Sequence, residues 1–205
     1  MDHELSPTQT LLKSTASDFF AREFPLDRIR EFRKDPDPAE RGLWKAIAGL
    51  GWGAAPFDEA TGGFPGSFLE AAVLLEEMGW ACAPSPFVHS VIAAGLPLAG
   101  RHDGLIGDVA SGEAVVVPVP VAPGRPLAQR EGDTASGTFL GVPWTDLATH
   151  YLLPGGDGCL LVEAQATGVS SKRLDSPGIE SVGALEVKSA AVAASYDARF
   201  VGEVT

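Results

Sequence analysis

The feature that most constrains the fold is a change of texture midway along the 205-residue chain. Before residue 112 the sequence carries paired helix start and stop signals, and from residue 115 onward it carries short apolar runs between glycine-containing turns. Helices and strands bury apolar residues with different periods, so the two halves cannot share one secondary structure. The pattern predicts an α+β protein: an all-α, up-and-down helical bundle over 1–112, then a small antiparallel β-barrel or β-sandwich domain over 113–205.

Helix start signals recur through the first half. Ser6 precedes a proline and lies three residues before a glutamine, which is the spacing of a capping box. Asp37 repeats this pattern, and Ser67 begins a third helix that we expect to reach about residue 83. In that helix Glu70 and Glu77 are expected on a different face from the apolar stripe. The expected stripe consists of Phe68, Ala71, Ala72, Leu75, Met78 and Cys82.

A fourth start signal at Ser85-Pro86 predicts a helix that ends at Pro97. Four or five helices are therefore expected in all. In the second half, turn clusters such as Gly155-Gly156-Asp157-Gly158 bound the apolar runs, which favours strands. The predicted strands include residues 115–117, 138–140, 150–153, 159–162 and 184–187.

Charge and cysteine content exclude several classes of protein. The chain has 15 basic and 27 acidic side chains and a net charge of −12, so binding to a nucleic-acid backbone is a poor fit. Its two cysteines, Cys82 and Cys159, lie far apart and form no CxxC pair, which argues against a disulfide framework or a structural zinc site.

The start of the chain and its apolar runs indicate the cellular compartment of the protein. The first residues are polar and acidic, unlike a signal peptide. The most apolar run, 114–123, is interrupted by two prolines and is far shorter than the ~20 residues that cross a bilayer. We therefore expect a soluble cytoplasmic protein with no membrane partner.

The residues alone reveal no catalytic or metal site. There is no GxSxG motif, and the four histidines have no metal-ligand spacing. His89, within a predicted helix, is better explained as a packed or half-exposed side chain than as a metal ligand. The glycine-rich segment 49–53 ends a helix instead of starting one after a strand, so it is not a dinucleotide-binding loop.

One ordered set of motifs is distinctive. Residues 43–52 read LWKAIAGLGW, and Pro56, Glu59 and Gly62-Gly63 follow; the next helix ends in EEMG at 76–79. This set resembles the amino-terminal helical domain of the acyl-CoA dehydrogenase family. Four segments of the second half resemble the middle β-domain of that family, namely its entry at 110–113, a hairpin turn at 136–138, a turn at 168–170 and a final strand at 199–203.

The resemblance implies a three-domain flavoenzyme. FAD would lie between the β-domain and a carboxy-terminal helical bundle, and a glutamate on that bundle would remove the α-proton of an acyl-CoA thioester. This chain ends at Thr205, where the third domain would begin. We therefore expect the piece alone to be inactive, with acyl-CoA as substrate and other acyl-CoA dehydrogenase chains as homo- or hetero-oligomeric partners.

The positions that would contact flavin depart from the family pattern. Where the family has Thr-Glu-Pro followed by Gly-Ser, this chain has VAPGR at 121–125, so Val121 and Gly124 stand at flavin-facing positions without the hydroxyls and the carboxylate. The family aromatic residue and the threonine near it correspond, three positions late, to Trp144 and Thr145. These two residues would lie against the isoalloxazine ring; alternatively, Trp144 is a core or edge aromatic of the β-domain.

Three functions remain open. The chain is part of a flavin-dependent acyl-CoA dehydrogenase, a degenerate subunit that pairs with a flavin-binding chain, or a non-enzymatic binding or assembly module on the same fold. In the family, the helices corresponding to 67–83 and 85–99 set chain-length and steroid preference. Small residues there suggest room for a bulky acyl group, as in lipid or steroid catabolism, although core packing explains them as well.

Overall fold

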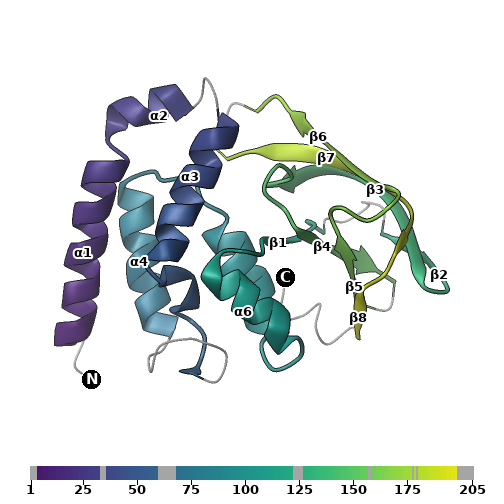
Figure 1. Ribbon diagram of the computed structural model, residues 1–205, viewed down its shortest axis with the longest axis horizontal. Helices are drawn as coiled ribbons and strands as arrows, with labels where there is room; N and C mark the ends of the chain where they lie inside the picture. Colours follow the sequence, from purple (N-terminus) through teal and green to yellow (C-terminus); the bar gives the residue numbers. More distant parts are fainter. Residues whose placement is uncertain are drawn as a thin grey trace.

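The computed structural model describes residues 4–32, 36–59, 68–121, 127–156, 158–176, 178 and 180–197. Its helices pack on one side of the molecule and its strands on the other (Figure 1). The helical elements are α1 (Pro7–Glu23), α2 (Leu26–Phe32), α3 (Pro36–Gly49), the 3-10 turn η1 (Trp52–Ala54), α4 (Phe68–Trp80), the π-helix η3 (Phe87–Gly95), α5 (Leu96–Leu98) and α6 (Asp103–Ser111).

The first start signal is confirmed in full. The Ser6 hydroxyl accepts a hydrogen bond from the Gln9 backbone N–H at 3.2 Å, and the Gln9 side chain accepts one from the Ser6 N–H at 2.9 Å. This reciprocal capping box satisfies two backbone donors that the first turn of α1 would otherwise leave unpaired. At the second signal, α3 already begins at Pro36, so Asp37 lies inside the helix. The third signal, Ser67, lies outside the described residues.

The buried face of α4 differs from the predicted stripe. The helix ends at Trp80; Phe68 is 52% exposed and Cys82 is also exposed, whereas Leu74 is fully buried. Glu77, predicted on a different face, is buried. Glu77 is buried because α1 packs against α4, where Lys13 of α1 lies 3.7 Å from the Glu77 carboxylate.

Pro97 does not end the fourth predicted helix. The segment 87–95 forms a π-helix, and Pro97 then lies at the start of the short helix α5. A proline is tolerated in a first helical turn because its missing N–H has no intrahelical acceptor there. The π-helical turns, which are wider than α-helical turns, therefore lie before Pro97 in the chain.

The strands form two four-stranded sheets, with the orders β1-β4-β5-β8 and β2-β3-β7-β6. All strand pairs among the described residues are antiparallel, as predicted, except β1 with β4, which is parallel. The strands are β1 (Val116–Pro118), β2 (Gln129–Glu131), β3 (Thr134–Pro143), β4 (His150–Gly155), β5 (Gly158–Glu163), β6 (Val169–Leu174), β7 (Val182–Ala191) and β8 (Ala194–Asp197).

Two details of the strand prediction are corrected. Residues 136–138, expected as a hairpin turn, lie inside β3 at a register irregularity, and the turn before β3 instead contains Gly132 at φ +59°. Strands β2, β6 and β8 were not predicted, because none of them contains a strongly apolar run. The predicted strand at 199–203 lies outside the described residues.

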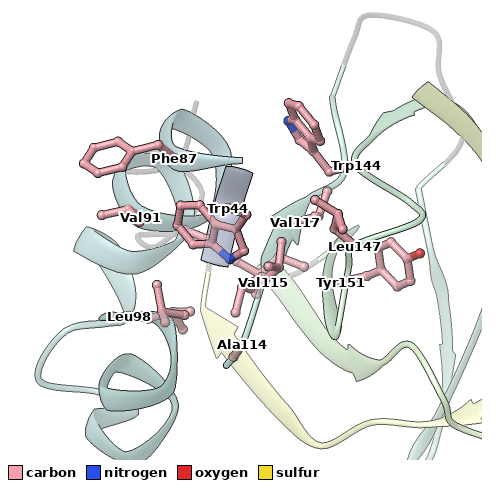
Figure 2. Packing of buried hydrophobic residues seen from close by; sticks show 14 of the residues in the cluster. Trp44, Phe87, Val91, Leu98, Ala114, Val115, Val117, Trp144, Leu147 and Tyr151 are labelled. Carbon is pink, nitrogen blue, oxygen red and sulfur yellow. The ribbon is translucent and has the colours of Figure 1, made fainter. Parts of the chain in front are cut away.

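One continuous core joins the helical and strand regions. Val116 and Val117 of β1 are fully buried, and β1 packs against η3 (Figure 2). The change from helix to strand falls between the end of α6 at Ser111 and the start of β1. The division into domains 1–112 and 113–205 stays a prediction. None of the described helices is both long and apolar enough to cross a membrane.

We predict that Gly112→Ala destabilises the chain by roughly 2–4 kcal/mol, measured by urea unfolding. Gly112 has φ +79°, and an added Cβ would collide with the Ala48 side chain. The matched control is Gly100→Ala, which has φ +74° but no atom within 4 Å of the added Cβ, so it carries the backbone penalty alone. Equal losses in the two variants would contradict the steric argument.

Candidate functional site

Trp144 lies at the junction of the helical and strand regions. It follows β3 directly and has a left-handed backbone, with φ +54°. Its N–H donates to the Ser181 carbonyl at 2.9 Å, and its indole Nε1–H donates to His89 Nδ1 of η3 at 3.2 Å. The side chain is fully buried (Figure 2). Because a bulky residue in this conformation is strained, the surrounding contacts must hold it in place.

Thr145 is buried next to Trp144, with 5% of the residue exposed. Its hydroxyl packs so closely on Gly183 that a Cβ added to that glycine would collide with it. Neither the Thr145 Oγ1 nor the Ser181 Oγ has a hydrogen-bond partner among the described residues. Two unpaired buried hydroxyls therefore lie beside the strained Trp144 backbone, each shielded from solvent.

The other two predicted flavin-facing positions, Val121 and Gly124, add no polar side chain to this site. Val121 is 49% exposed and offers only alkyl groups, and Gly124 lies outside the described residues. The structure adds His89 and Ser181 to the neighbourhood of Trp144, which the sequence analysis missed. No local motif marks either residue, because both reach Trp144 from distant parts of the chain.

The residues described at these positions do not fit a flavin as they stand. The side chains of Trp144 and Thr145 are buried, and the Val121 side chain has no donor or acceptor, so these three side chains offer a flavin no accessible polar group. Contact of FAD with Val121, Gly124, Trp144 and Thr145, inferred from the resemblance, stays a prediction.

The protonation state of His89 follows from its bond to Trp144. Nδ1 accepts the indole hydrogen, so this nitrogen must be unprotonated. Burial lowers the pKa of His89 below its ordinary value of 6.5, and the Glu180 carboxylate opposes that shift. The neutral imidazole is therefore the form that joins η3 to the strand region.

The remaining ionisable groups form no catalytic arrangement that we can identify in the described part of the chain. His102 Nδ1 lies 3.0 Å from the Tyr196 hydroxyl, and burial lowers the pKa of His150. Burial also raises the pKa of the Cys159 thiol to about 11, so this cysteine is not a nucleophile at neutral pH. Among the described residues no group of three or more His, Cys, Asp or Glu could hold a metal ion.

We predict that His89→Leu lowers the free energy of unfolding at pH 8 by about 1–3 kcal/mol, because the buried indole N–H of Trp144 loses its acceptor. Since the pKa of His89 is lower in the folded chain, its contribution is complete above about pH 6.5 and is lost as the pH falls through the folded-state pKa.

The control is His89→Asn, which retains an acceptor near the position of Nδ1 but does not titrate. Urea unfolding between pH 8 and pH 5 should show that the wild type loses more stability on acidification than His89→Asn. Parallel pH profiles for these two proteins would refute the assignment.

Comparisons with known proteins find similarity in sequence and in fold. Residues 6–102 match the model of the family described as "Acyl-CoA dehydrogenase, N-terminal domain". The Mycobacterium tuberculosis protein named acyl-CoA dehydrogenase FadE28 is 28% identical over 139 residues, which are 63% of this chain and 41% of that protein.

Three solved structures share the fold. The steroid acyl-CoA dehydrogenase Tcur3481-Tcur3483, in a G363A variant, matches with a TM-score of 0.83 at 27% identity. The match covers 96% of this chain and 59% of the chain in that structure. The ChsE4-ChsE5 complex from Mycobacterium tuberculosis has a TM-score of 0.81 at 24% identity, covering 97% and 57%. An acyl-CoA dehydrogenase complexed with FAD from Bacillus anthracis has a TM-score of 0.79 at 18% identity, covering 94% and 38%.

The chain therefore spans less than two thirds of the length of each of these relatives. Within that part, the family model covers the helical region and the structural matches extend through both sheets. Residues 6–102 therefore match the N-terminal domain of the acyl-CoA dehydrogenase family, and the helical and strand regions together share the fold of these solved structures.

Proposed function

We propose that this chain is part of a subunit of a hetero-oligomeric acyl-CoA dehydrogenase, in which a partner chain holds FAD and this chain helps to shape the acyl-CoA site. The observation that carries the proposal is the shielding of Trp144 and Thr145, together with the alkyl side chain of Val121. A chain that buries two of its expected flavin-facing side chains and presents only alkyl groups at a third has kept the fold and lost part of the surface that would face a flavin.

The names of the relatives support pairing. ChsE4-ChsE5 is described as a complex, and the Tcur3481-Tcur3483 structure, described as a steroid acyl-CoA dehydrogenase, is named for two proteins. The reaction proposed for the assembled enzyme is the α,β-dehydrogenation of an acyl-CoA thioester. FAD, when bound, supplies the redox chemistry.

A groove of about 360 Å³ at the end of α4 is the part of this chain that we assign to the acyl group. Met78 and Val88 line it with apolar surface, and Cys82, Ser85 and Glu180 lie at its polar positions. Ser85 is turned inward, where its hydroxyl donates to the Met78 sulfur at 3.7 Å. An apolar groove with few polar groups suits a hydrocarbon or steroid side chain.

We predict that this chain, produced alone, purifies without the visible absorption of bound flavin. Produced together with a flavin-binding acyl-CoA dehydrogenase chain as partner, it should form a stable yellow complex. Absorption spectra and size-exclusion profiles of the two preparations are the measurements. Stoichiometric flavin bound to this chain alone would refute the proposal. A colourless monomer that binds neither the partner chain nor acyl-CoA would favour a non-enzymatic module.

We further predict that Val88→Trp raises the KM of the assembled enzyme for a bulky acyl-CoA about tenfold, because the indole fills the groove, and tenfold corresponds to about 1.4 kcal/mol. Val88 is 49% exposed, so the chain should remain folded. The control is Leu11→Trp on the outer face of α1, where the native residue is 65% exposed. If both variants show the wild-type KM, the groove does not hold the acyl group.

A further inference from the structure

A cleft of about 440 Å³ lies where α3 meets the junction of the helical and strand regions. One wall is a face of α3, the second is the segment that joins α6 to β1, and the third is the loop between β3 and β4. We call it the α3 cleft. Its volume suits a small molecule, and none of its lining residues belongs to the acyl groove.

The indole nitrogen of Trp44 provides this cleft with an unused hydrogen-bond donor. Trp44 is 3% exposed, and its Nε1–H has no acceptor among the described residues. The nitrogen lies on the side of the ring that faces Val115 (Figure 2), and a Cβ added to Gly112 would lie 3.6 Å from it. Trp44, Gly112 and Val115 all line the cleft. A buried donor without an acceptor costs free energy, which an acceptor brought into the cleft would recover.

The two hydroxyl groups in the walls already have acceptors. The Ser111 hydroxyl donates to the Asp108 carbonyl at 3.1 Å, and the Thr149 hydroxyl donates to the Val115 carbonyl at 3.2 Å. The indole N–H therefore stays as an unused donor of the buried wall, and the ligand group that pairs with it must be an acceptor.

The charged residues of the cleft favour an acceptor with one negative charge. Arg41 and Lys45 are four residues apart, so they share one face of α3. The Arg41 guanidinium is anchored, since it donates to the Asp146 carbonyl. Glu113 lines the cleft from the α6–β1 segment. Two cations and one carboxylate leave one net positive charge, which a monoanion balances.

We propose that the α3 cleft binds a small monocarboxylate with a short apolar body. One carboxylate oxygen accepts the Trp44 Nε1–H, and the charge of the carboxylate is balanced by Lys45 and Arg41. The hydrocarbon part lies against Ala48 and Leu147, which give the cleft apolar surface. A carboxylate suits these donors because both of its oxygens accept hydrogen bonds. The site does not depend on whether this chain binds flavin or pairs with another chain.

The ligand oxygen reaches the indole through a small rearrangement of the cleft wall, because Nε1 is shielded from solvent in this structure. The Lys45 and Glu113 side chains are exposed, and neither has a hydrogen bond or ion pair with another described residue. Both side chains can therefore move without breaking such a contact. Binding should be visible at the indole hydrogen itself, since that hydrogen gains its acceptor only when the ligand enters.

The test follows the Trp44 Nε1–H signal in ¹H–¹⁵N NMR spectra while sodium butyrate is added to this chain. Resonance assignment identifies the signal among the four tryptophans, and Trp44→Phe checks it by its loss. We expect a saturable downfield shift at millimolar butyrate, because the hydrogen gains an acceptor. Butanol, sodium chloride and sodium phosphate should leave the signal in place. Absence of a saturable shift with butyrate would overturn the site, and an equal shift with phosphate or butanol would overturn the monocarboxylate assignment.

Two charge variants should change the affinity for butyrate in opposite directions. Lys45→Gln should weaken binding about fivefold, whereas Glu113→Gln should strengthen it about threefold, because it removes a like charge. The matched control is Lys172→Gln, which removes an exposed lysine of β6 that does not line the cleft. All three variants keep Trp44 and alter exposed side chains, so the same signal reports on each even if Trp44→Phe fails to fold. Equal affinity in these variants and the wild type would overturn the proposal.

Discussion

The burial of β1 between the helices and the first sheet is the constraint on which the rest of the structure depends. Its two central valines are fully buried, so its backbone groups have no access to water. Ser90 of η3 accepts the Val116 N–H at 2.9 Å, and Thr149, just before β4, accepts the Val115 N–H at 2.9 Å. One side chain from the helical region and one from the strand region therefore satisfy neighbouring donors and fix the two regions against each other.

The strained backbone at Trp144 follows from the same packing. The residue leaves β3 with a positive φ, and the turn directs its indole to His89, which lies on the same π-helix as Ser90. Two hydrogen bonds thus connect buried donors of the strand region to η3, one to an imidazole and one to a hydroxyl. The indole is also fully buried, so its ring face is shielded from solvent.

Two hollows border α4. The end that borders η3 carries the apolar groove, and the side that borders α1 carries the hollow with Glu77. Both lie near the C-terminal end of the helix, where Trp80 is the last helical residue.

Local chemistry was readable from the sequence. The capping box at Ser6, the change from helices to strands after residue 112 and five of the strands depend on neighbouring residues, and the structure contains all of them. The family motifs were also readable, because their glycines and acidic pairs occur in a fixed order along the chain.

Long-range packing was not readable from the sequence. The burial of Glu77 depends on α1, the parallel pairing of β1 depends on β4, and the place of Trp144 depends on His89, 55 residues earlier. Periodicity within one element reports how many residues are buried, but the neighbouring elements decide which side they face. The sequence by itself therefore determined the change from helices to strands, five of the strands and the family resemblance, and only the tertiary structure decided that Trp144 and Thr145 are shielded, because their neighbours come from distant segments.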